Sequence, residues 1–200
     1  MKITAIKQQV KQADRYSISV DGKYAFSLSE SGLLNTGLRL NQEFTENELE
    51  ELRTRAVIDK AFGWALNLIS HRSRSEWEIR EYLKRKEYEP DITEQAVGKL
   101  RERGYINDED FARRWVESRR LLKATSKRRL SQELRQKRVS DEAIEKVLAA
   151  DETDEAEVLK QLIERKRKQS RYQDDMKLMQ YLNRQGFQYD NIKRAMSGSD

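Results

Sequence analysis

The sequence predicts a mainly α-helical protein, in which three tandem three-helix repeats follow a small N-terminal β-hairpin unit. Apolar and polar residues alternate in the first 45 residues, as in strands, whereas from Thr45 onward apolar residues recur at helical spacing. A pattern of cap, apolar stripe and turn then recurs three times, about 50 residues apart. Because apolar residues make up 36% of the chain and charged residues 38%, we expect the repeats to form an elongated, curved array.

The composition excludes several kinds of site. The chain has no cysteine, and His71 is its one histidine, which excludes disulfides, thiol chemistry and zinc sites. No run of 18 apolar residues and no signal-peptide core are present, so we expect a cytoplasmic protein with no membrane partner. The sequence also shows neither a glycine-rich phosphate loop nor a catalytic constellation, so we expect neither an enzyme nor a cofactor.

The first 45 residues predict a small β unit. Residues 15–29, RYSISVDGKYAFSLS, alternate apolar and polar side chains around a turn at Asp21-Gly22. Residues 2–10, KITAIKQQV, predict a third strand. Residues 32–40, GLLNTGLRL, contain two glycines and predict a short turn followed by an edge.

Two registers are possible for this hairpin. A two-residue turn at Asp21-Gly22 would pair Ile18 with Ala25 and put the apolar rows of the two strands on opposite faces. A three-residue loop, with Gly22 in the left-handed region, pairs Ile18 with Tyr24 instead. We favour the three-residue loop because it keeps both apolar rows on one face.

The helical part begins at Thr45, which forms a predicted capping box with Glu48. Three further polar residues, Ser75, Ser126 and Asp174, are predicted to cap the second helix of each repeat. Apolar residues follow each cap at the same spacing: Ile79, Leu83 and Tyr88; Leu130, Leu134 and Val139; and Leu178, Leu182 and Phe187.

An apolar-striped helix precedes each of these caps. Its stripe comprises Phe62, Leu66 and Ile69 in the first copy, Phe111, Trp115 and Leu122 in the second, and Val158, Leu162 and Ile163 in the third. We therefore predict an N-terminal β-hairpin unit over residues 1–54 and three-helix repeats over residues 55–105, 106–150 and 151–200.

The aromatic residues are predicted to pack in the core. Phe111, Trp115 and Leu122 share one helical face, which is more typical of core packing than of an exposed base-stacking platform. The same interpretation covers Trp64. Trp77 lies off the apolar stripe of its helix, so we expect it either to cover a neighbouring unit or to be partly exposed.

Three consecutive acids, Asp108, Glu109 and Asp110, raise the question of a magnesium site. They directly follow Asn107, a good N-cap, and the helix dipole favours acids in a first helical turn. Successive side chains on a helix also point about 100° apart, so the three cannot converge on one ion without ligands from elsewhere in the chain. We expect no metal site and attribute these acids to the start of the helix.

The positive charge is concentrated in one segment. The net charge is +5, but residues 113–138 hold eleven Lys and Arg against two acids. We predict an outward stripe of Lys127, Arg128, Arg135 and Arg138, because Leu130 and Leu134 on the same helix face inward. Such a local surplus favours a surface that binds an anionic partner. The predicted binding residues are Arg113, Arg114, Arg120, Lys123, Lys127, Arg128, Arg135, Lys137 and Arg138.

Smaller basic runs occur in the first and third repeats. They comprise Arg72, Arg74, Lys84 and Arg85, and Arg165, Lys166 and Arg167, and we treat them as secondary basic patches.

Two segments carry a recognisable pattern, RSRSEWEIREYLKRK at residues 72–86 and GYINDEDFARRWVESR at residues 104–119. They resemble motifs of the RecX family, regulators of the bacterial recombinase RecA. With the third repeat, the resemblance covers about residues 55–197. The chain departs from the family pattern at Arg138, where members often carry glycine.

The resemblance implies a regulator, most often an inhibitor, that docks along the groove of the RecA filament on single-stranded DNA. It implies effects on strand exchange, ATP hydrolysis and filament growth, and a role in DNA repair and the SOS response. We expect the chain to act as a monomer. The alternative is a module that binds single- or double-stranded DNA directly through the same basic residues.

Overall fold

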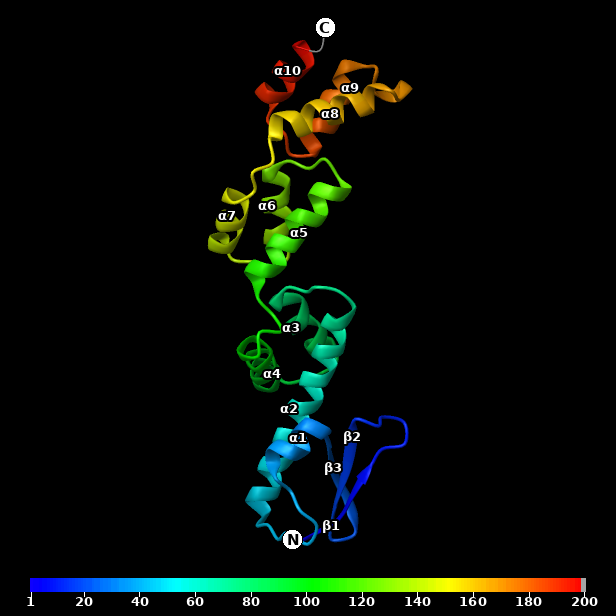
Figure 1. The fold of residues 1–200 in the computed structure, drawn as a ribbon, viewed down its shortest axis with the longest axis vertical. Helices are drawn as coiled ribbons and strands as arrows, with labels where there is room; N and C mark the ends of the chain where they lie inside the picture. The colour runs from blue at the N-terminus through cyan, green and yellow to red at the C-terminus, as the bar shows by residue number, and fades with distance from the viewer. Residues whose placement is uncertain (199–200) are drawn as a thin grey trace. The chain divides into compact units, whose positions relative to one another are not determined.

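A computed structural model describes residues 1–198 of the protein, which folds into two compact units, Met1–Ile106 and the chain from Asn107 onward. The first unit combines a small sheet with helices, and the described part of the second unit is helical (Figure 1). The predicted mainly α-helical fold, with three three-helix repeats after a β unit, is confirmed.

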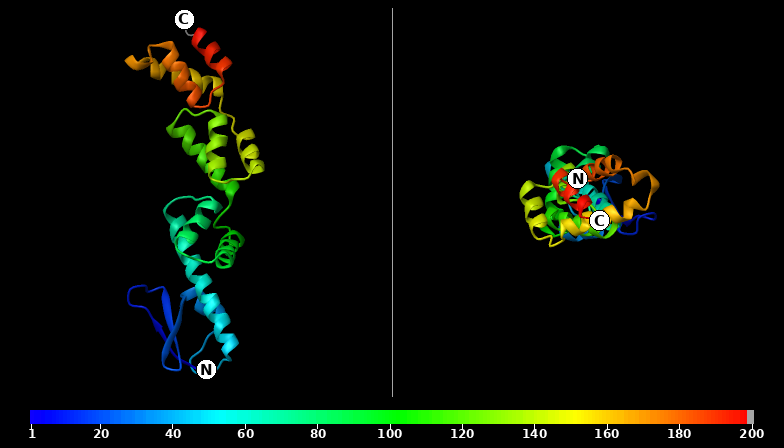
Figure 2. Two further views of the ribbon diagram at one scale, coloured as in Figure 1. Left: turned by 180° about the vertical axis from the view of Figure 1, so that it is seen from behind. Right: turned by 90° about the horizontal axis from the view of Figure 1, so that it is seen from above.

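An antiparallel sheet begins the chain, with strands β1 (Ile3–Gln8), β2 (Arg15–Val20) and β3 (Lys23–Ser29) in that order. The predicted third strand is therefore present as β1. The sheet lies against α1 (Glu30–Thr36) and the first half of α2 (Glu46–His71), as Figures 1 and 2 show. Buried apolar residues from both layers form this core: Ile3, Ile18, Phe26, Leu28, Leu49, Leu52 and Ala56.

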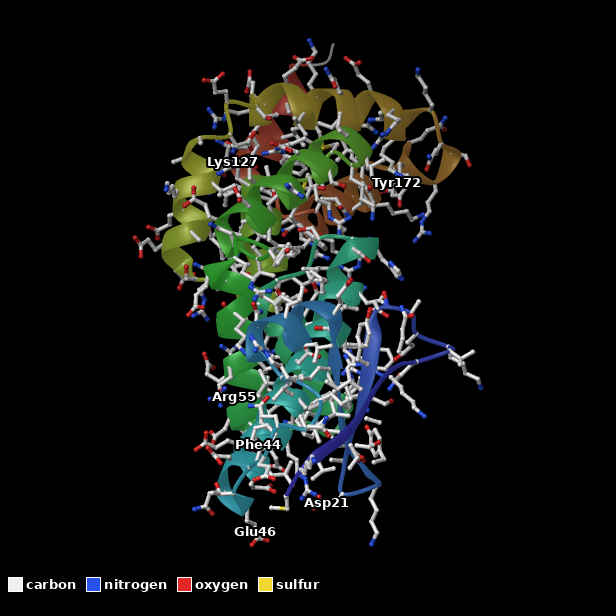
Figure 3. The ribbon with its side chains drawn as sticks, turned by 60° about the horizontal axis from the view of Figure 1, so that its bottom comes forward. Asp21, Phe44, Glu46, Arg55, Lys127 and Tyr172 are labelled. Carbon is white, nitrogen blue, oxygen red and sulfur yellow. The ribbon has the colours of Figure 1, made fainter. Side chains whose placement is uncertain are left out.

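The predicted hairpin register is wrong. Asp21-Gly22 forms a two-residue turn, labelled at Asp21 in Figure 3, in which both φ angles are positive, 49° and 80°. A β-bulge then shifts the register, so that Ile18 pairs with Phe26 and Tyr24 pairs with Ser19. The two-residue turn suits the twist of the strands, and the bulge restores a common apolar face. Tyr24 lies on the other face with Ser19 and is exposed.

A helix, α1, occupies much of residues 32–40, where a turn and an edge were predicted. It begins after Ser29, whose side chain accepts a hydrogen bond from the backbone N–H of Gly32, and it ends at Gly37, with φ 62°. The cap is easy to overlook because Ser29 is also the last residue of β3. A Cβ on Gly32 would lie 2.7 Å from Oδ1 of Asp59, so glycine permits the close approach of α1 and α2.

A buried ion pair joins the sheet to α2. Arg15 contacts Asp59 at 3.2 Å, and the two side chains are 11% and 14% exposed. Asp59 also accepts hydrogen bonds from the backbone N–H and the hydroxyl of Ser29, at 2.8 and 2.5 Å. Asp59 therefore fixes the paired ends of β2 and β3 against the middle of α2.

The first repeat consists of the second half of α2 with α3 (Glu76–Arg85) and α4 (Pro90–Glu102). The predicted capping box at Thr45 is present, and the predicted cap Ser75 also forms a capping box, with Glu78. Because α2 is continuous from Glu46 to His71, the predicted boundary between residues 54 and 55 falls inside a helix.

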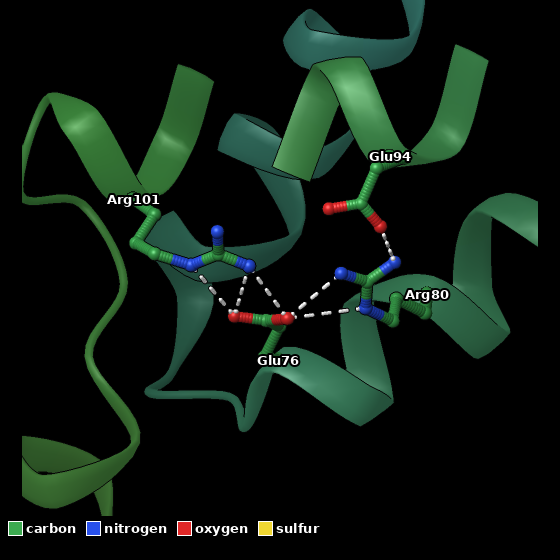
Figure 4. Close-up of polar contacts among 4 residues, drawn as sticks. All are labelled: Glu76, Arg80, Glu94 and Arg101. Atoms are coloured by element: carbon green, nitrogen blue, oxygen red, sulfur yellow. Dashed lines mark hydrogen bonds and ion pairs between the residues drawn. The ribbon is translucent and has the colours of Figure 1, made fainter. Parts of the chain in front are cut away.

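Charged side chains connect α3 with α4 (Figure 4). Glu76 accepts hydrogen bonds from Arg80, one turn further along α3, at 2.8 Å and from Arg101 of α4 at 2.9 Å. Arg80 also donates to Glu94 of α4 at 2.6 Å, and this hydrogen bond is the main cause that raises the pKa of Arg80 and lowers the pKa of Glu94. Cations of the first repeat thus stabilise the repeat itself.

The second unit contains the other two repeats. The second comprises α5 (Asp108–Leu122), α6 (Lys127–Gln136) and α7 (Asp141–Ala149). The third comprises α8 (Glu155–Arg167), the 3-10 turn Ser170–Tyr172, α9 (Asp175–Arg184) and α10 (Tyr189–Ser197). The predicted caps, Ser126 and Asp174, each accept a hydrogen bond from the backbone N–H three residues on. Each repeat has its own apolar core.

The aromatic predictions hold in part. Phe111 is buried, Trp64 and Trp115 pack at the edges of their cores, and Trp77 is 37% exposed. Leu122, predicted to be core, is 72% exposed because the buried stripe of α5 ends at Val116. Cations cover the two packed indoles, Lys86 at 4.0 Å from Trp64 and Arg119 at 4.4 Å from Trp115.

The turn between the second and third helices has the same backbone conformation in all three repeats. Glu87, Arg138 and Gly186 occupy this position, with φ angles of 62°, 58° and 90°. The turn of the third repeat packs against the second repeat, since the Ser126 hydroxyl donates a hydrogen bond to the carbonyl of Gln185 at 2.9 Å. A Cβ on Gly186 would lie 3.0 Å from Cβ of Arg129, so this contact favours glycine.

A second buried ion pair closes the second repeat. Arg120, at the end of α5, contacts Asp151 at 2.6 Å, and the side chains are 12% and 8% exposed. Lys127 donates hydrogen bonds to the carbonyls of Asp151 and Leu148 at 2.7 and 3.2 Å. Burial raises the pKa of Asp151, but hydrogen bonds from Arg120 and Thr153 and the Arg120 charge outweigh this effect and lower the pKa.

We predict that Asp151→Asn lowers the free energy of unfolding by about 3 kcal/mol at pH 7, because it leaves a buried Arg120 charge uncompensated. A pKa that is lowered on folding contributes stability that is complete above the unfolded pKa, about 4, and is lost as the pH falls through the folded value. The difference should therefore shrink below about pH 4. Urea unfolding across this pH range measures it.

Asp141→Asn is the matched control, because its ion pair with Arg135 in the same repeat is more than half exposed on both sides. Its cost should stay below about 1 kcal/mol. An equal decrease in the free energy of unfolding in the two variants would show that burial does not make the Arg120–Asp151 pair more important than an exposed pair.

We predict that Arg138→Gly stabilises the second repeat by about 0.5 kcal/mol. Glycine relieves a left-handed conformation that costs other residues about 1 kcal/mol, and loses part of this gain to its greater freedom in the unfolded chain. Arg135→Gly, inside α6, should instead cost about 1 kcal/mol. Urea unfolding of both variants checks this, and a loss of stability in both would contradict the proposed strain.

Candidate functional site

One group of exposed cations in the second repeat lies on α6 and in the turn that directly follows it. Arg128, Gln132 and Arg135 are spaced by four and three residues, which places them on the face opposite the buried Leu130 and Leu134. Arg129 is 45% exposed on the same helix, and Arg138 is exposed in the turn that follows it. We call Arg128, Arg129, Arg135 and Arg138 the α6 face.

Little of the charge on this face is neutralised. Arg135 pairs with Asp141 at 2.7 Å, but both side chains are more than half exposed, so water screens the contact. Arg129 lies 3.6 Å from Glu133, which also contacts Arg119 at 2.7 Å. Within residues 1–198, Arg128 and Arg138 form no ion pair. The face can therefore attract an anionic surface.

Two of the predicted binding residues, Arg120 and Lys127, are not exposed. Arg120 is buried against Asp151, and it also donates to the carbonyl of Thr125 at 2.5 Å. Lys127 donates to two backbone carbonyls at the C-terminal end of α7. The predicted outward position of Lys127 is wrong, and Arg120 is largely buried, because their acceptors at Leu148 and Asp151, 21 to 31 residues further along the chain, lie beside the end of α5 and the start of α6.

The remaining predicted residues are divided between exposed and packed positions. Arg114 and Lys123 are exposed, and neither forms an ion pair within residues 1–198. Arg113 contacts Asp110 at 2.9 Å and Glu109 at 3.4 Å. Lys137 is half-buried, 5.4 Å from the centre of the Trp115 ring.

The three consecutive acids serve the start of α5, as the sequence indicates. Asn107 caps the helix by accepting hydrogen bonds from the backbone N–H groups of Glu109 and Asp110. Glu109 also contacts Lys146 of α7 at 2.7 Å, and the hydrogen bond from this lysine is the main cause that lowers the pKa of Glu109. Within residues 1–198, no group of three or more His, Cys, Asp or Glu could hold a metal ion.

Most cations of the secondary basic patches contact acidic or aromatic side chains within the chain. Arg72 contacts Glu78 at 3.0 Å, and burial together with the Arg72 charge lowers the pKa of Arg74. Lys166 lies over the Tyr181 ring at 4.7 Å, and Arg167 pairs with Asp175. The exposed members without an ion pair in the described part of the chain are Lys84, Arg85 and Arg165.

Sequence reasoning missed Asp151 and Glu133, which decide which cations are available. Glu133 accepts hydrogen bonds from Arg119 at 2.7 Å and from the indole N–H of Trp115 at 3.0 Å. Its spacing from Arg129 on α6 is a local signal for one of its contacts. Asp151 has no such signal, because Arg120 lies 31 residues away.

The site has the chemistry of a binding surface. Its charged side chains are guanidinium groups spread over one face of a helix, which can contact phosphates or carboxylates but hold no paired acid and base. No helix in residues 1–198 combines the length and apolar character needed to cross a membrane.

Family models match nearly the whole chain. The RecX N-terminal domain matches residues 1–45, and the first, second and third three-helix domains of RecX match residues 61–100, 107–148 and 152–196. The last three matches coincide with the three repeats of the structure.

Relatives named Regulatory protein RecX agree with these matches. One from Listeria monocytogenes is 33% identical over 98% of this chain and 74% of its own length, and one from Bacillus subtilis is 31% identical over 97% and 75%. Another, from Listeria welshimeri, is 38% identical, and the match spans 55% of its length. A crystal structure of regulatory protein RecX superposes with a TM-score of 0.77 at 28% identity, over 98% of both chains. The chain therefore belongs to the RecX family of regulatory proteins.

Proposed function

We propose that this chain inhibits a RecA recombinase in the cytoplasm, acting as a monomer that docks on the recombinase filament formed on single-stranded DNA. The observation that carries the proposal is the α6 face, which exposes four arginines, whereas Arg120 and Lys127 of the same repeat are bound internally. Membership of a family of regulatory proteins, together with the non-catalytic character of the site, supports a regulator over an enzyme.

In the proposed mechanism, the protein inhibits the filament by occupying a surface shared by neighbouring recombinase subunits. Serial helical repeats can contact neighbouring filament subunits at once, which would hold their relative orientation or block the addition of the next subunit. Either effect would reduce ATP hydrolysis, strand exchange and filament growth. The α6 face would supply electrostatic attraction and orientation, which charged surfaces contribute more strongly than raw affinity.

Direct DNA binding by the same arginines is the second candidate. It is favoured by the exposed guanidinium groups, which suit phosphates. In that case the affinity for naked single-stranded DNA would match the affinity for the filament, and it would fall steeply with salt.

We predict that Arg128→Glu/Arg135→Glu/Arg138→Glu weakens filament binding about 30-fold at 0.1 M salt, because three exposed attractions become repulsions. Inhibition of DNA-stimulated ATP hydrolysis should need correspondingly more protein. The matched control is Arg39→Glu/Arg53→Glu/Arg55→Glu, which changes the charge equally at exposed positions of the first unit. It should retain inhibition, and unchanged inhibition by the α6-face variant would refute the proposed contact.

Naked single-stranded DNA distinguishes the two candidates. If direct phosphate contacts dominate, the α6-face variant should lower the slope of log affinity against log salt by about two, since each lost contact contributes about 0.7. If the filament is the partner, wild-type protein should inhibit at concentrations at which it does not bind naked DNA.

A further inference from the structure

The last turn of α5 exposes two adjacent leucines. Leu121 is 86% and Leu122 is 72% exposed, and neither belongs to an apolar core of the described chain. Single exposed leucines are common on protein surfaces. Two together beside a hollow, in a chain with only 36% apolar residues, indicate a contact surface.

The hollow lies between this turn and α8, and has a volume of about 310 Å³. From α8, Val158, Gln161, Leu162 and Arg165 line it, at the spacing of one helical face. Leu162 is 1% exposed and belongs to the core of the third repeat. The hollow therefore has apolar side chains from both repeats, and we call it the Leu121 groove.

The charged side chains that line the Leu121 groove are all basic: Arg120, Lys123 and Arg165. Arg120 forms the buried ion pair with Asp151. Lys123 and Arg165 are exposed, and neither forms an ion pair within residues 1–198. The groove thus combines an apolar lining with two available cations.

We propose that the Leu121 groove binds an acidic amphipathic segment of a protein partner. An apolar side chain of this segment would enter between the exposed leucines and α8, and its carboxylates would contact Lys123 and Arg165. The identification of the partner with the recombinase filament rests on the proposed function.

Other occupants fit less well. Nucleic acid would leave Leu121 and Leu122 against phosphates and sugars, and the groove lining has no exposed aromatic ring on which a base could stack. A second copy of this chain, joined by a two-fold axis, would bring the same cations together.

The test compares Leu121→Ser/Leu122→Ser with Leu34→Ser, a matched control because Leu34 is 75% exposed in the first unit. Both changes affect exposed side chains, so thermal unfolding should be unchanged. We expect the double variant to bind the filament at least about tenfold more weakly, as truncation of anchoring residues does at interfaces, and the control to bind normally. Lys123→Glu/Arg165→Glu should also weaken binding.

A labelled helical peptide of about three turns, with leucines on one face and glutamates beside them, is titrated in parallel. It should bind wild-type protein and Leu34→Ser, and lose binding to the double leucine variant. A photoreactive residue in place of Leu122 should cross-link to an acid-rich segment of the filament protein.

Unchanged filament binding by the double leucine variant would overturn the proposal, as would cross-links only to DNA or to a second copy. If wild-type protein does not bind the filament, the proposed function fails. The peptide then decides alone: binding that needs Leu121 and Leu122 supports the groove, and no binding overturns it.

Discussion

The ion pair between Arg120 and Asp151 determines how the second repeat presents its charge. It joins the end of α5 to the segment that leads into α8, and it brings the backbone carbonyls that hold Lys127 to the same place. Two of the cations in the basic segment are thereby removed from the surface. The α6 face and the exposed end of α5 remain accessible to a partner, as does Arg114.

Charged side chains stabilise the fold in the other parts of the chain as well. With few apolar residues per repeat, the small cores are supplemented by polar contacts such as the Arg15–Asp59 pair and the Glu76 network. Cations also cover the indoles of Trp64 and Trp115. Many cations of this protein therefore contribute to its stability. Only those that stay exposed to solvent are available to bind another molecule.

Much of the fold could be predicted from the sequence because its signals are local. Helix caps such as Thr45, Ser75 and Ser126 act on backbone groups three residues away, and apolar spacing identifies the buried faces. The hairpin register could not be predicted, because a bulge compensates for the turn. The burial of Arg120 and the exposure of Leu122 depend on where distant segments return, which no local pattern encodes.

The most direct test of docking through the α6 face is hydrogen–deuterium exchange of this protein, alone and with the recombinase filament. Docking predicts slower exchange in α6 and the turn at Arg138 when the filament is added, and no comparable change with naked single-stranded DNA. Slower exchange confined to other segments, or equal protection by naked DNA, would contradict the assignment of the α6 face as the filament contact.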